Sequence, residues 1–67
     1  MSSLGEEYPK AQARLRVIVM CAKEIGPAGA FLATIGEDCL RRADKAAIEQ
    51  DTVAMIRIYQ EMMDFKE

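Results

Sequence analysis

The stretch RLRVIVMCAKEIG, from Arg14 to Gly26, decides the fold of this chain. Six consecutive residues within it, from Val17 to Ala22, are apolar. A helix on the surface of a small protein normally carries one apolar stripe and a polar opposite side. Plotted on a helix, this segment carries two apolar stripes and only a narrow polar strip. It therefore predicts a helix that is covered on two sides.

Both apolar stripes follow helical spacing. The first has steps of three and four residues and comprises Ala11, Leu15, Ile18, Ala22 and Ile25. The second lies on another side of the same helix and comprises Ala13, Val17, Met20 and Cys21. Because a self-contained helical bundle needs only one stripe per helix, the second stripe is surplus to a core made by one chain.

Turn signals predict where this first helix begins and ends. Pro9 suits the first turn of a helix, and Gly26 can adopt the left-handed conformation that often ends one. We therefore expect the helix over residues 9–25. The segment MSSLGEEY before it, residues 1–8, is predicted to be a flexible tail.

Two further helices follow after clear breaks. The sequence GPAG, residues 26–29, separates the first helix from a second, expected over residues 30–50. Asp51 is a favourable N-cap for a third helix, expected over residues 52–65. No strand pattern is present, so the predicted fold class is all-α, with three helices in a single domain over residues 9–67.

The second and third predicted helices also have apolar faces. The apolar face of the second comprises Leu32, Ile35, Cys39, Ala43 and Ala46. Gly36 and Ala47 lie beside this face and would allow another helix to approach closely. The apolar half of the third comprises Met55, Ile56, Ile58, Tyr59, Met62, Met63 and Phe65. Three helices of this size present more apolar surface than one small core can bury, which indicates intermolecular contact.

Oligomerisation is also the expected source of stability. A 67-residue chain buries only about 60% of its unfolded surface, and such domains rely on disulfides, metals or association. The chain has no histidine, and Cys21 and Cys39 form no CxxC pair, so we predict neither a metal nor a cofactor. We expect two buried free thiols, with a disulfide between helices as the alternative.

A symmetric homodimer is the simplest form of association, because one self-complementary patch suffices. The predicted dimer interface consists of Val17, Met20 and Cys21, together with part of the third helix.

Several function classes are disfavoured by composition. There is no histidine, and the only serines, Ser2 and Ser3, lie in the predicted tail, so we predict no catalytic residue and no enzyme. The net charge of −2 disfavours nucleic acid as a partner, and neither later helix begins with the basic residues of a recognition helix. No apolar run approaches the length of a membrane span, and no signal peptide is evident, so we expect a cytoplasmic protein.

Protein binding is the function class that remains. Methionine and aromatic side chains are common in interfaces, so we predict Tyr59, Met62 and Phe65 as anchors for a partner. The acidic side chains Glu37, Asp38 and Glu61 would form the rim of the contact. Each of these residues could instead belong to the core or to a solvated helix face.

The segment AGAFLATIGEDCLRRADKAAIEQDTVAMIRIYQEM, from Ala28 to Met62, resembles small helical proteins encoded in the early regions of Mu-like temperate phages. The resemblance covers about half of the chain and includes no catalytic or ligand motif. One member of that family is a dimer that binds a LuxR-type quorum-sensing activator and a type IV pilus assembly ATPase. The resemblance therefore implies an inhibitor of a host protein, such as a transcription regulator, but assigns no individual binding residue.

Two alternatives remain. The segment ADKAAIEQDTVAMIRIYQEM also looks like the helix pair of repeat and microtubule-interacting-type domains, which favours a structural or adaptor module that binds a peptide or a partner helix. A small DNA-binding regulator is the less favoured alternative.

Overall fold

The computed structural model describes residues 3–65 and contains three α-helices, with no strand in that range. They are α1 (Leu4–Ile25), α2 (Pro27–Ile48) and α3 (Thr52–Asp64). The predicted all-α fold of three helices is confirmed. Their dominant apolar faces point inward, which explains why three amphipathic segments fold into one unit.

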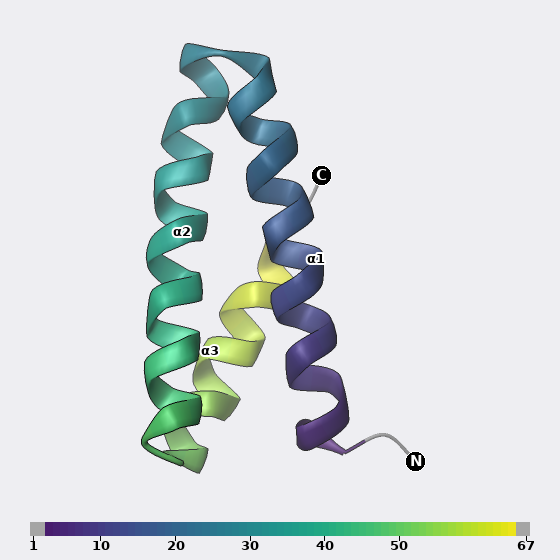
Figure 1. Ribbon diagram of the computed structural model, residues 1–67, viewed down its shortest axis with the longest axis vertical. Coiled ribbons are helices and arrows are strands. Elements are labelled where there is room, and N and C mark those ends of the chain that lie inside the picture. Colours follow the sequence, from purple (N-terminus) through teal and green to yellow (C-terminus); the bar gives the residue numbers. More distant parts are fainter. Residues whose placement is uncertain (1–2, 66–67) are drawn as a thin grey trace.

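The long helices α1 and α2 run antiparallel and form a hairpin, and α3 packs on one of its sides (Figure 1). α1 and α2 have 22 residues each, whereas α3 has 13. At about 1.5 Å per residue, α3 is roughly 20 Å long against roughly 33 Å for the hairpin. In Figure 1, α3 rises from the α2–α3 turn and ends about halfway up the hairpin. The end of the hairpin near the α1–α2 turn therefore has no helix upon it within the described residues.

The α1–α2 turn is a single residue, Gly26, with a φ of 104°. This backbone conformation is readily adopted only by glycine. Pro27 then begins α2, where its missing N–H costs nothing because the first N–H groups of a helix have no partner. α2 thus starts three residues before the predicted position, and the predicted four-residue break is only one residue long.

α1 begins at Leu4, five residues before the predicted start at Pro9. The cause is Tyr8, whose side chain is only 2% exposed and whose hydroxyl donates a hydrogen bond to the carbonyl oxygen of Ala43. Burial of this ring against α2 stabilises the turn that precedes the proline. Residues 4–8 therefore belong to the folded domain, and the predicted boundary at residue 9 is wrong. Met1 and Ser2 of the predicted tail lie outside the described residues.

The first stripe of α1 predicted four of the buried core residues correctly. Ala11, Leu15, Ile18 and Ala22 are buried as expected, but Ile25 is exposed. On α2, the buried members of the predicted face are Cys39, Ala43 and Ala46, whereas Leu32 is partly buried and Ile35 is exposed.

The hairpin is tight because two glycines of α2 face α1. A Cβ atom built on Gly36 would lie 2.5 Å from Cγ2 of Val19, and one on Gly29 would lie 1.8 Å from the carbonyl oxygen of Ala22. The absence of a side chain at these positions therefore sets the distance between the two helices.

Both ends of α3 are fixed by side chains. Asp51 accepts a hydrogen bond from the backbone N–H of Ala54 at 3.2 Å, which confirms the predicted N-cap. At the other end, Arg14 of α1 donates to the carbonyl oxygens of Met62 and Phe65 at 3.2 and 2.7 Å. The carbonyl oxygen of Met62 also accepts a hydrogen bond from the N–H of Phe65 at 3.3 Å, so Arg14 adds a second donor there and joins the C-terminal end of α3 to α1.

Candidate interaction surfaces

The three predicted partner anchors do not form an exposed patch. Met62 is 0% exposed and lies among the buried residues of the core, so its prediction as a binding anchor is wrong. Tyr59 and Phe65 are partly buried and pack against the same core. Met62 occupies the side of α3 that faces the hairpin. The apolar half of α3 is broad, and the sequence alone did not show which of its residues would face the hairpin.

In the predicted acidic rim, Asp38 and Glu61 are exposed and Glu37 is partly buried, but all three carboxylates already have cationic partners. Glu37 pairs with Lys23 of α1, and the hydrogen bond and charge of that lysine lower the pKa of the Glu37 carboxyl group. Asp38 pairs with Arg41 and Arg42 on its own helix. Glu61 of α3 accepts a hydrogen bond from Arg42 at 2.9 Å.

A basic partner would have to compete with these internal pairs. Surface ion pairs of this kind contribute little free energy each. The predicted role of the acidic rim therefore stays a prediction, and a partner that uses it must displace intramolecular cations.

The predicted dimer residues are on the outside of the molecule. Val17 is 52% exposed and Met20 is 65% exposed, and Cys21 is an exposed free thiol. The expectation that both cysteines are buried is therefore wrong for Cys21 and right for Cys39. The homodimer itself stays a prediction.

The structure adds an exposed apolar surface that sequence reasoning did not identify. We call it the open-end face, and it comprises Ile25, Phe31 and Ile35, near the α1–α2 turn. Phe31 is 74% exposed, Ile25 69% and Ile35 41%. Ile25 and Ile35 are predicted by periodicity to lie on inward faces, but periodicity does not show which part of each face the shorter α3 covers.

Helical geometry places the open-end face on the same side of the hairpin that α3 covers nearer the α2–α3 turn. Phe31 precedes Arg42 by eleven residues, which is about three full turns, so both lie on one line along α2. Arg42 contacts α3 through Glu61. By the same spacing, Ile25 lies on one line of α1 with Arg14, which contacts the end of α3. The open-end face therefore continues the surface on which α3 packs.

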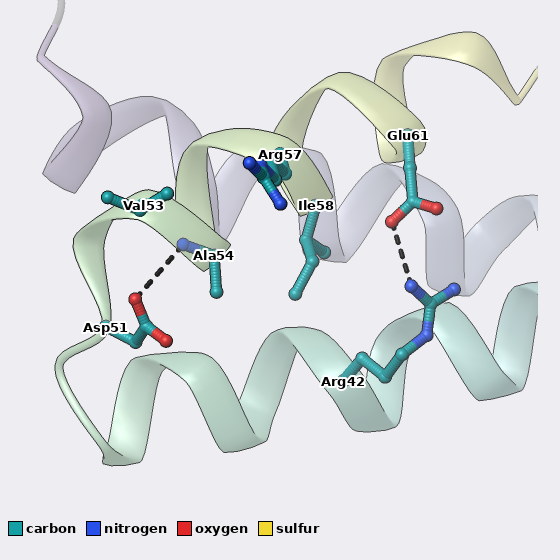
Figure 2. A pocket seen from close by; sticks show the side chains of 7 residues that line it. All are labelled: Arg42, Asp51, Val53, Ala54, Arg57, Ile58 and Glu61. Atoms are coloured by element: carbon teal, nitrogen blue, oxygen red, sulfur yellow. Dashed lines mark hydrogen bonds and ion pairs between the residues drawn. The ribbon is translucent and has the colours of Figure 1, made fainter.

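A second feature is a hollow of about 590 Å³ at the start of α3, lined by Arg42, Asp51, Val53, Ala54, Arg57, Ile58 and Glu61 (Figure 2). Three of its four charged side chains are already engaged in hydrogen bonds. Asp51 caps Ala54, and Arg42 bonds to Glu61. Two guanidinium groups and two carboxylates balance in charge, so the hollow has no strong preference for an anion or a cation.

Ionisable groups in the interior offer no reactive chemistry. Burial raises the pKa of the Cys39 thiol, which therefore stays neutral and a poor nucleophile near pH 7. Burial and the charge of Asp44 likewise raise the pKa of the Tyr8 hydroxyl. Within residues 3–65, no three side chains of the His, Cys, Asp and Glu types gather where they could hold a metal ion. In that same part of the chain, none of the helices is both long and apolar enough to cross a membrane.

Comparison with known proteins found no match to any family model, to any curated protein or to any solved structure.

Proposed function

We propose that this chain is a non-enzymatic, homodimeric protein-binding module that inhibits a host protein, and that the open-end face is its binding surface. The observation that carries the proposal is the exposure of Phe31 and Ile25 at the end of the hairpin that α3 leaves uncovered. Exposed aromatic and large aliphatic side chains that lie together commonly anchor protein interfaces.

The shape of the surface favours a helix as the bound element. α3 packs on the lower part of the same side of the hairpin, so the side chains of α1 and α2 already form a surface that receives a helix there. The uncovered part is roughly 13 Å long, the difference between the hairpin and α3, which fits two to three helical turns. We therefore propose that the partner contributes a short amphipathic helix that continues the path of α3.

The identity of the target rests on the resemblance to early proteins of Mu-like phages. That resemblance favours a transcription regulator of the LuxR type, in the bacterial cytoplasm, as the host protein. Apolar anchors such as Phe31 would slow dissociation of the complex, whereas acidic side chains such as Asp38 would mainly accelerate association with a basic DNA-binding surface.

The test uses a purified LuxR-type quorum-sensing activator and measures its affinity for the protein by isothermal titration calorimetry. Phe31→Ala should weaken binding by about 30-fold, because a true anchor contributes about 2 kcal/mol or more. Ile48→Ala is the matched control, because Ile48 is also an exposed aliphatic residue of α2 but lies at the opposite end of the hairpin. It should leave the affinity unchanged.

The outcomes separate the parts of the proposal. No binding of the activator would reject this target. Binding that is unaffected by Phe31→Ala would reject the open-end face. Both variants should keep the wild-type melting temperature, because both side chains are exposed.

An adaptor would use the same surface for a partner helix but would leave the partner active. A transcription reporter for the activator distinguishes the two functions: repression supports the inhibitor, and binding with unchanged transcription supports the adaptor.

A further inference from the structure

We propose that two copies of this chain associate through the outer side of α1 as an antiparallel pair, with the two-fold axis close to Val17. The inference deepens the homodimer of the proposed function by giving its contact surface and orientation. The residues that form the contact, called here the outer α1 seam, are Lys10, Ala13, Val17, Met20 and Glu24.

The outer α1 seam is free of intramolecular packing. All five of its residues are exposed, and none belongs to the core or to the side chains packed against it. Their positions follow steps of three, four, three and four residues, the spacing by which one helix packs along another. The apolar residues lie in the middle of the seam, and the charged residues lie at its two ends.

The charges at the two ends decide the orientation. Lys10 lies seven residues before Val17, and Glu24 lies seven residues after it, so each is about 10 Å from the proposed axis. In an antiparallel pair, Lys10 of one protomer meets Glu24 of the partner subunit, and this contact occurs twice. A parallel pair would instead place lysine against lysine and glutamate against glutamate, which is unfavourable.

Neither charge is strongly engaged within its own chain. Glu24 makes no ion pair within the described residues, and the amino group of Lys10 lies 3.8 Å from a carboxylate oxygen of Glu7, a long contact on an exposed side chain. Both are therefore available to a second copy.

The geometry also gives a different role to Cys21. In the antiparallel pair, the two copies of Cys21 lie about 12 Å apart along the helices, which is more than the Cα separation that a disulfide can span. The dimer is therefore non-covalent, and Cys21 lies at the edge of the contact instead of at its centre.

Charge reversal tests the contact and its orientation together. The dissociation constant of the dimer would be measured by sedimentation equilibrium at low salt for Lys10→Glu, Glu24→Lys and the double variant. Each single variant should weaken the dimer by about tenfold, because two attractive contacts become repulsive. The double variant restores both attractive contacts and should return to within about twofold of the wild type. A dimer that is indifferent to these changes, or that the double variant fails to rescue, overturns the proposed geometry.

Val17→Glu provides a second test, because it places two like charges at the axis. It should convert the dimer to a monomer without lowering the melting temperature of the monomer, because Val17 is exposed. Phe31→Asp is the matched control on the open-end face and should leave the dimer intact. Loss of the dimer with Phe31→Asp but not with Val17→Glu would mean that the open-end face joins the two copies, and the proposal would fail.

Disulfide cross-linking between engineered cysteines tests whether the two α1 helices run antiparallel. In a Cys21→Ser background, an oxidised mixture of the Lys10→Cys and Glu24→Cys variants should form the mixed disulfide faster than either variant links to itself. The reverse preference indicates a parallel pair and overturns the proposal. A protein that stays monomeric at every concentration overturns both the geometry and the homodimer. Binding of an activator by the open-end face is measured separately, so its outcome does not depend on the result for the dimer.

Discussion

The hydroxyl group of Tyr8 donates a 2.7 Å hydrogen bond to the carbonyl oxygen of Ala43, a residue 35 positions later in the chain. The bond joins the beginning of α1 to the far part of α2 inside the core. It makes the first turns of α1 part of the cooperative fold, although a proline follows immediately.

Replacing Tyr8 by phenylalanine should lower the free energy of unfolding by about 1 kcal/mol, the usual net value of one buried hydrogen bond. Tyr8→Ala should cost about 3–5 kcal/mol, because it also removes a buried ring. Urea denaturation followed by circular dichroism measures both. If Tyr8→Ala unfolds at the same urea concentration as the wild type, the first turns of α1 do not belong to the core.

The close approach of α1 and α2 can be tested at Gly36. Gly36→Ala should destabilise the fold by about 1–3 kcal/mol, because its Cβ would clash with the end of the Val19 side chain. Combining it with Val19→Ala should cost less than the sum of the two single changes, because the smaller residue relieves the clash. Additive free energies in this double-mutant cycle would contradict the close contact.

Gly5 and Gly29 are comparison positions for Gly36→Ala, because a Cβ atom would have no close neighbour at Gly5 and a very close one at Gly29. Gly5→Ala should be neutral or stabilise the fold by up to about 1 kcal/mol, because alanine favours a helix and the nearest atom to its Cβ would be 3.7 Å away. Gly29→Ala should be the most damaging of the three, because its Cβ would collide with backbone that cannot rotate away. Thermal unfolding of the three variants should give this order of stability.

Met62 and Met63 are adjacent on α3, but only Met62 belongs to the core, so alanine substitutions at the two positions should differ in their effect on stability. Met62→Ala should cost about 2–5 kcal/mol of unfolding free energy, since Met62 is completely buried. Met63→Ala should cost less than about 1 kcal/mol, because Met63 is 45% exposed. Equal losses in chemical denaturation would mean that α3 is rotated relative to the structure.

Stability should fall in alkaline solution. Burial raises the pKa values of the Cys39 thiol and the Tyr8 hydroxyl above their ordinary values of 9.0 and 10.0, so the folded state favours their neutral forms. Their contribution is fully present below those ordinary values and is lost as the pH rises through the raised values. The free energy of unfolding should therefore decline above about pH 9. The Tyr8→Phe variant should show a shallower decline above pH 10, and an unchanged slope would contradict the role of Tyr8.

The sequence by itself determined the number and type of elements. Helical periodicity, Gly26 and the capping residue Asp51 act locally, through the backbone preferences of a few neighbouring residues, so they predicted three helices and the start of the third. The stripe from Ala11 to Ala22 is one of two apolar stripes predicted on α1, and its burial identifies it as the core side.

Tertiary structure alone decided the start of α1 and the role of each apolar face. Tyr8 extends α1 past the position of Pro9 because it finds a hydrogen-bond partner 35 residues away, which local propensity does not record. Met62 is core and Phe31 is exposed because α3 packs on one side of a longer hairpin and ends before its tip. Burial depends on how the packed helices are rotated and placed along one another, and these are properties of the assembled fold.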